Sequence, residues 1–98
     1  KLTSAAFDAH LGQSFRLYPG AGDPLLVELI QVTPLDPGRR RPAGMRQQPF
    51  SLVFRGPQDV VLPQGTYRLE HEVMGVLEIF LVPIGPDVKG MRYEAVFN

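Results

Sequence analysis

The chain contains no cysteine among its 98 residues. This absence excludes disulfide bridges, zinc sites with thiolate ligands and cysteine nucleophiles. A cysteine-free sequence fits any redox compartment, and we expect the default one, the bacterial cytoplasm. The N-terminal stretch does not have the layout of a signal peptide, because Asp8 and His10 interrupt the apolar residues between Leu2 and Leu11.

Net charge is also missing, since ten Lys and Arg balance ten Asp and Glu. No long-range field therefore draws the molecule to nucleic acid or to an anionic membrane, and we expect neither as a partner. The densest apolar run, Val76 to Ile84, contains Glu78 and Pro83 and is far shorter than the about 20 residues that span a bilayer. Eight of the ten cationic residues are Arg, whose planar group favours the paired and stacked contacts found at interfaces.

The sequence lacks a recognisable catalytic motif. It has no nucleophile elbow, no zinc-binding His-Glu-x-x-His and no phosphate loop. The run Glu70-His71-Glu72 is rich in potential ligands, but adjacent residues of a strand point to opposite faces, so His71 would share a site with neither glutamate. Gly20-Ala21-Gly22 begins like a dinucleotide-binding fingerprint, lacks its third glycine and is interpreted as a turn. The sequence thus predicts no catalytic residue, no bound metal and no cofactor.

Short β-type runs closed by Gly or Pro make up most of the chain. A short helix is predicted over Thr3–Gly12, with Thr3 or Ser4 as its cap and Gly12 at its end. Short links between successive strands require antiparallel pairing. We therefore expect one all-β domain over residues 1–98, a small antiparallel β-barrel or rolled sheet of about six strands with one short N-terminal helix. The strands are expected at residues 13–18, 25–33, 50–55, 66–71, 76–82 and 92–97.

The segment Leu25–Thr33 has two interpretations. Pro24 followed by apolar residues at helical spacing is typical of a capped helix. Its β-branched residues favour a strand, which is the prediction made here. Glu28 and Gln31 are three residues apart, a spacing that a regular strand cannot place on one face, so we expect a β-bulge near Leu29–Ile30.

Alternation within the strands predicts a core rich in aromatic residues. The residues expected to be largely buried are Phe15, Leu17, Phe50, Leu52, Phe54, Tyr67, Leu69, Phe80 and Phe97.

One long segment, residues 35–48, is rich in Arg, Pro and Gly and is expected to be a flexible loop without regular structure. Its run Arg39-Arg40-Arg41, followed by Arg46, is the one marked charge cluster of the sequence. Such a cluster either lies in a solvated loop without a partner or binds an acidic protein surface or a nucleic acid. Aromatic residues for base stacking are absent nearby, which disfavours nucleic acid.

The run Val76–Val82 is apolar on both faces apart from Glu78, which is typical of a strand covered on both sides. One face would fill the barrel, and the N-terminal helix or another chain would cover the second face. We expect Leu77 and Ile79 on that second face, with arginines on the polar faces of other strands forming a rim. The resulting candidate interaction surface comprises Arg16, Arg39, Arg40, Arg41, Arg68, Leu77, Ile79 and Arg92.

Four motifs carry a resemblance to a known family: PFSLVFRGP at 49–57, LPQGTYRLEH at 62–71, FLVP at 80–83 and MRYEAVFN at 91–98. The chain resembles a family of small bacterial domains of unknown function. The resemblance implies no catalytic residue, because none is established for the family. It also implies an association with phage-tail-like gene neighbourhoods, and so a role in assembly or interaction.

Two functional hypotheses follow from these observations. The first is a non-enzymatic module that assembles with itself or with a larger protein partner. The alternative is a small-ligand-binding or enzymatic barrel whose pocket lies at the barrel mouth and uses Arg55, Tyr67, Arg68 and His71. Convergent polar groups in a pocket would favour the alternative, and an exposed apolar patch would favour the first hypothesis.

Overall fold

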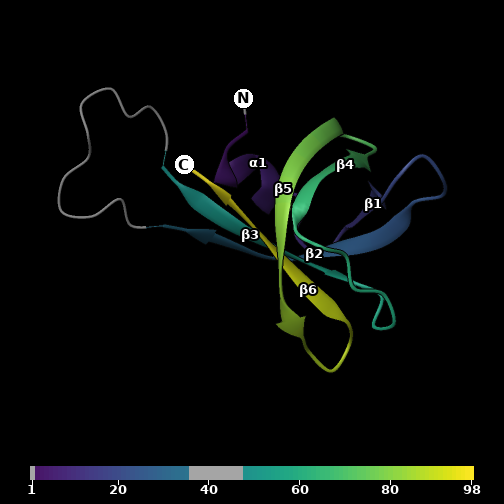
Figure 1. The fold of residues 1–98 in the computed structure, drawn as a ribbon. Coiled ribbons are helices and arrows are strands. Elements are labelled where there is room, and N and C mark those ends of the chain that lie inside the picture. Colours follow the sequence, from purple (N-terminus) through teal and green to yellow (C-terminus); the bar gives the residue numbers. More distant parts are fainter. Residues whose placement is uncertain (1, 36–47) are drawn as a thin grey trace.

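A computed structural model of the chain describes residues 2–35 and 48–98. Within them lie one short helix and six strands, as the sequence predicted (Figure 1). The predicted Arg/Pro/Gly-rich loop falls mostly outside the described residues. The elements are α1 (Ser4–Asp8), β1 (Ser14–Tyr18), β2 (Leu25–Pro34), β3 (Phe50–Gly56), β4 (Gly65–His71), β5 (Gly75–Pro86) and β6 (Met91–Phe97).

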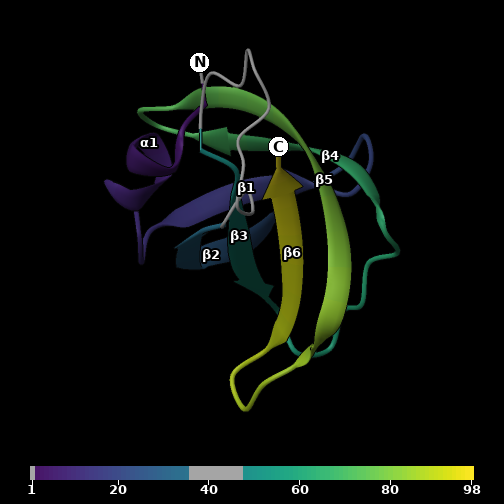
Figure 2. The ribbon, with the colours of Figure 1, turned by 90° about the vertical axis from the view of Figure 1, so that its left-hand side faces the viewer.

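The six strands form a closed antiparallel barrel in the order β1-β2-β3-β6-β5-β4. Two meanders, β1-β2-β3 and β4-β5-β6, are joined along two seams, where β3 pairs with β6 and β4 pairs with β1. Figure 2 shows β5 curving around the barrel with β4 and β6 beside it. Closure pairs each described strand on both sides, so the fold offers no free sheet edge among them to a partner strand.

Helix α1 is shorter than predicted, because beyond Asp8 the backbone hydrogen bonds join residues three apart, as from His10 to Phe7 and from Leu11 to Asp8. The Thr3 hydroxyl caps it by accepting a hydrogen bond from the Ala6 amide at 3.1 Å. Gly12 has a φ of +86°, which a residue with a side chain rarely adopts, and so turns the chain into β1. Phe7 is fully buried, whereas Leu11, within the predicted helix, is exposed in the turn beyond the observed one.

The ambiguous segment Leu25–Thr33 is a strand, and the predicted β-bulge is confirmed. The register between β2 and β3 shifts between Leu29 and Gln31, which reconciles the spacing of the polar residues. A second shift occurs in β5 between Pro83 and Gly85, where Gly85 has a φ of +101°. The middle strand of each meander is thus its longest and is bent by a bulge.

Side chains from all six strands and α1 fill the barrel. Phe7 closes one end, with its ring centroid 6.0 Å from that of Phe50 and 5.7 Å from that of Phe97. At the other end the segment 57–64 lies under the barrel, where the Tyr93 hydroxyl accepts a hydrogen bond from the buried Leu62 amide at 3.0 Å. Six of the nine predicted core residues are fully buried: Phe15, Leu17, Phe50, Leu52, Phe54 and Leu69.

The exceptions among the predicted core residues are informative. Tyr67 and Phe97 are partly buried and pack against the core. Phe80 is exposed, with 52% of its surface accessible, and that prediction was wrong. Its exposure follows from the register of β5, which pairs Phe80 with the outward-facing Thr66 of β4.

That register also corrects the orientation of β5. Leu69 pairs with Leu77 and Tyr67 pairs with Ile79, so Leu77 and Ile79 share the inner face. They are 8% and 2% exposed, which means that they belong to the core and cannot form an interaction surface. The face of β5 that remains open is the opposite one, which carries Val76 and Phe80.

Candidate functional site

The outer surface of β1 and β4 carries a cluster of charged and aromatic side chains. Alternation turns Phe15 and Leu17 into the barrel, so Arg16 and Tyr18 point outward. On β4 the buried Leu69 places Arg68 and Glu70 on the outside in the same way. Pairing of Arg16 with Glu70 and of Tyr18 with Arg68 then brings the four outward side chains together.

Glu70 is the centre of this cluster. Its Oε1 accepts a hydrogen bond from the Tyr18 hydroxyl at 3.2 Å and lies 3.5 Å from Arg16 Nη2. Its Oε2 lies 3.4 Å from Arg68 Nε. The Arg68 guanidinium also lies over the Tyr18 ring, with Cζ 4.1 Å from the ring centroid. One carboxylate thus holds two guanidinium groups, and the aromatic ring fixes the plane of one of them.

Exposed apolar side chains flank the cluster on neighbouring strands. Leu26 of β2 pairs with Arg16, and Val76 of β5 pairs with Glu70. Both are 63% exposed. Phe80 follows on β5, and of the six phenylalanines it alone is exposed. We call this surface the Arg–Tyr face and define it as Arg16, Tyr18, Leu26, Arg68, Glu70, Val76, Glu78 and Phe80.

The structure brings together two of the predicted surface residues, Arg16 and Arg68. Arg92 lies elsewhere, on β6, where it pairs with Arg55 of β3 and its Nε donates to the Gly85 carbonyl at 3.2 Å. Arg39, Arg40 and Arg41 lie outside the described residues. Sequence reasoning missed Tyr18, Glu70, Val76 and Phe80 as surface residues. The strand predicted at residues 13–18 already contained Tyr18, and its alternation places Tyr18 on the same face as Arg16, whereas Val76 and Phe80 required the register with β4.

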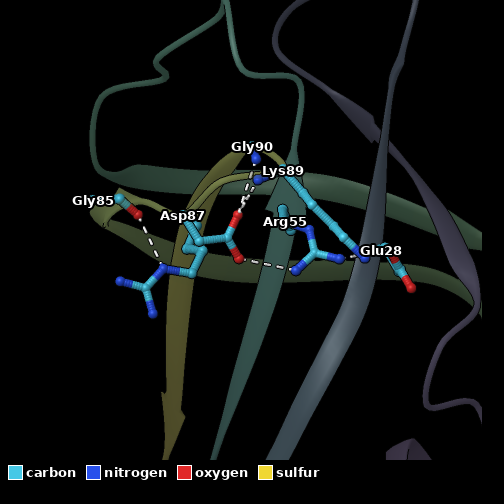
Figure 3. Close-up of polar contacts among 7 residues, drawn as sticks. Glu28, Arg55, Gly85, Asp87, Lys89 and Gly90 are labelled. Atoms are coloured by element: carbon cyan, nitrogen blue, oxygen red, sulfur yellow. Dashed lines mark hydrogen bonds and ion pairs between the residues drawn. The ribbon is translucent and has the colours of Figure 1, made fainter.

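A second polar cluster fixes the hairpin between β5 and β6 against β3 (Figure 3). Arg55 Nη1 lies 3.0 Å from Asp87 Oδ2, and Arg55 Nη2 lies 3.3 Å from Glu28 Oε1. The other oxygen of Asp87 accepts hydrogen bonds from the Lys89 and Gly90 amides at 2.8 and 3.0 Å. The Lys89 amide first, and then the Arg55 side chain and the Gly90 amide, lower the pKa of the Asp87 carboxyl. The charged groups of the cluster are partnered within the fold, so this cluster is structural.

A family model matches residues 2–97 of the chain, which is nearly its whole length. The chain belongs to the family described as a domain of unknown function, DUF6916. This confirms the family resemblance seen in the motifs. No curated protein and no solved structure matches the chain.

In this DUF6916 domain, His71 faces the interior and Glu70 faces outward, and the predicted placement of these neighbours on opposite faces of the strand is confirmed. His71 Nδ1 accepts hydrogen bonds from the Val73 and Met74 amides at 3.0 and 3.2 Å, and its Nε2 lies 2.7 Å from Gln13 Oε1. This arrangement requires the neutral ring with the proton on Nε2. Burial, and after it the neighbouring His10, lowers the pKa of His71.

The four residues expected to line a pocket at the barrel mouth do not converge. Tyr67 and His71 lie on the inner side of β4, where the Tyr67 hydroxyl donates to the Pro63 carbonyl. Arg68 is on the outer side of the same strand. Arg55 lies on β3 and forms ion pairs with the carboxylates of Glu28 and Asp87. Within residues 2–35 and 48–98, no three His, Asp or Glu side chains are grouped as metal ligands, and no helix is long and apolar enough to cross a membrane.

Proposed function

We propose that this DUF6916 domain is a non-enzymatic protein-interaction or assembly module of the bacterial cytoplasm, and that it docks through the Arg–Tyr face. The observation that carries the proposal is the position of the Arg16–Tyr18–Arg68–Glu70 cluster directly beside the exposed side chains of Val76 and Phe80. The phage-tail-like gene neighbourhood that the family resemblance implies is consistent with a role in assembly.

The composition of the face supports docking. Arg, Tyr and Phe are enriched in protein interfaces, and Arg and Tyr are also enriched among the residues that contribute most of the binding energy. Exposed apolar residues grouped with such side chains mark interaction sites more often than single exposed residues do. Phe80 provides the large apolar side chain, and the arginines on β1 and β4 provide the polar contacts beside it.

Preorganisation of the Arg68 side chain also supports docking through this face. A long Arg side chain ordinarily loses rotamer freedom when it binds, at a cost of roughly 0.5–1.5 kcal/mol. Arg68 is already held by Glu70 and by the Tyr18 ring, yet 49% of its side chain is exposed. The face therefore presents an ordered guanidinium group to a partner at a reduced entropic penalty.

The experiment is in-cell cross-linking of the tagged domain in its native bacterium, followed by purification and mass spectrometry. Phe80→Asp and Arg68→Glu should each remove the cross-linked proteins recovered with the parent domain. Val88→Asp is the matched control, because Val88 is 90% exposed at the β5–β6 hairpin, away from the face. Cross-linked proteins that are unchanged by both face variants would refute docking through this face.

A further inference from the structure

We infer that the occupant of the Arg–Tyr face is a second copy of this chain, packed about a two-fold axis that runs along β4 and β5 between them. In this arrangement Arg68 of each copy meets Glu78 of the other. The inference rests on the proposed function and specifies the partner.

Charge balance on the face is the first argument. The face carries two cations, Arg16 and Arg68, and two anions, Glu70 and Glu78. A two-fold interface brings a patch onto itself, so the patch must be complementary to itself. A face that carried charges of one sign would repel its copy. When neighbouring residues carry opposite signs, each can instead face an opposite charge on the second copy. The whole chain is also neutral, so two copies approach without long-range repulsion.

The state of Glu78 is the second argument. Arg68 and Glu78 are opposite each other in the register of β4 and β5. Nevertheless, Arg68 bonds to Glu70 and stacks on Tyr18. None of the four ion pairs in the described part of the chain includes Glu78. An exposed carboxylate outside those ion pairs therefore lies on the open face, between Val76 and Phe80.

The proposed axis gives that carboxylate a partner. An axis between β4 and β5 places each strand over the other strand of the second copy. Glu78 then lies over Arg68 twice, once on each side of the axis, and Phe80 lies over Thr66. An axis perpendicular to the strands would instead oppose Arg68 to Arg68 and Glu78 to Glu78, which is unfavourable.

The apolar residues complete the interface. Val76 and Phe80 lie on either side of Glu78 along β5 and are 63% and 52% exposed. Burying them against the second copy removes apolar surface from water and lowers the dielectric around the Arg68–Glu78 pairs. Val96, 53% exposed on β6, lies two residues beyond Glu94, the partner of Val82 on β5, and adds a further exposed apolar side chain.

Charge reversal in purified protein tests the arrangement. Sedimentation across a concentration series should show a dimer for the parent domain. Arg68→Glu and Glu78→Arg should each weaken self-association by at least about tenfold, because each variant opposes like charges. Mixing the two single variants should restore a dimer that contains one copy of each, since the carboxylate introduced at position 68 of one variant then meets the guanidinium introduced at position 78 of the other. Thermal unfolding of each variant shows separately whether it is folded.

Three results would overturn the inference: a parent domain that is monomeric throughout the series, a dimer unaffected by either reversal, or a mixture that stays monomeric. These outcomes are distinguishable from failure of the proposed function. A monomeric domain whose in-cell cross-links to other proteins still depend on Arg68 and Phe80 would exclude the second copy and leave the interaction module in place.

Discussion

His71 is a buried side chain whose hydrogen bonds select one protonation state. Its Nδ1 accepts hydrogen bonds from two backbone amides of the β4–β5 turn, and protonation of Nδ1 would break both bonds. The ring also lies against His10, with 4.4 Å between the ring centroids. The pKa of His71 is shifted, after burial and His10, by two further charged groups: Glu72, which favours the proton, and Arg16, which disfavours it.

The stability of the domain should therefore fall as the pH drops below about 6.5, the usual pKa of a histidine in an unfolded chain. Because the pKa of His71 is lowered in the folded state, the unfolded chain takes up the proton first. The stabilisation by neutral His71 is complete above that pH and is lost as the pH falls towards the folded-state pKa. Urea unfolding between about pH 8 and pH 5 would measure this, and His71→Gln should flatten the dependence. An equal slope in the variant would assign the effect to other groups.

Two phenylalanines test the distinction between core and surface. Phe54 is fully buried and meets Phe15 edge to face, with 5.4 Å between the ring centroids. Phe54→Ala should destabilise the domain by about 3–5 kcal/mol, because it leaves a cavity. Phe80→Ala should change the stability of the monomer by less than about 1 kcal/mol, since the side chain is exposed. Chemical denaturation at a concentration where the domain is monomeric gives both values, and similar losses would contradict the assigned register.

At the scale of the elements, the sequence predicted that β5 is a strand but not which of its faces is buried. Its existence was clear from the apolar run, but both of its faces are apolar, so local alternation gave no reason to prefer one as the inner face. Pairing with β4 makes the choice, because it aligns Leu77 with the buried Leu69. The bulge in β2 was predictable because Glu28 and Gln31 interrupt the alternation, whereas the bulge at Pro83–Gly85 had no comparable signal among polar residues.

Neighbouring residues of β5 provide a direct test of this orientation. Leu77→Asp should prevent folding or cost several kcal/mol, because it places a carboxylate in the core. Val76→Asp, one residue away on the open face, should leave the monomer folded. Circular dichroism and thermal unfolding of the two variants decide the matter, and the opposite ranking would reverse the faces of the strand.

The β5–β6 hairpin depends on close contact between two backbones. A Cβ atom on Gly90 would lie 2.1 Å from the carbonyl oxygen of Gly56, a contact that backbone atoms must move to relieve. Gly90→Ala should therefore destabilise the domain by about 1–3 kcal/mol and disturb the Asp87 turn beside it. Gly22→Ala is the matched control, because a Cβ there meets nothing within 4 Å. Equal thermal stability of the two variants would show that the hairpin can shift freely.

At the scale of the whole molecule, the two seams of the barrel differ in length. The β3–β6 seam has seven residue pairs in register, from Phe50 with Phe97 to Gly56 with Met91. The β1–β4 seam has three, centred on Leu17 and Leu69. The sequence predicted antiparallel pairing and the approximate number of strands. It did not predict that β3 pairs with β6 and β1 with β4, because these pairings join distant segments and have no local sequence pattern.

The shorter seam should be the first to open. Amide protons of β1 that bond to β4 should exchange faster under native conditions than those shared by β3 and β6, since fewer contacts protect them. Hydrogen exchange followed by NMR measures both sets. Slower exchange at the β1–β4 seam would contradict this order, and the exchange of β2 provides an internal reference within the same meander.

The division into two meanders also has a consequence for how the chain reaches its native state. Within each meander, successive strands are joined locally, so hairpins can form early. Both seams join residues far apart in the sequence, such as Arg16 with Glu70, and the entropy of closing such long loops must be met before the contacts are gained. We therefore expect closure of the barrel to be the slow event in folding. The segment 57–64 links the two meanders, and its Leu62 amide donates a hydrogen bond to the Tyr93 hydroxyl of β6, a contact that can form only once β6 is in place.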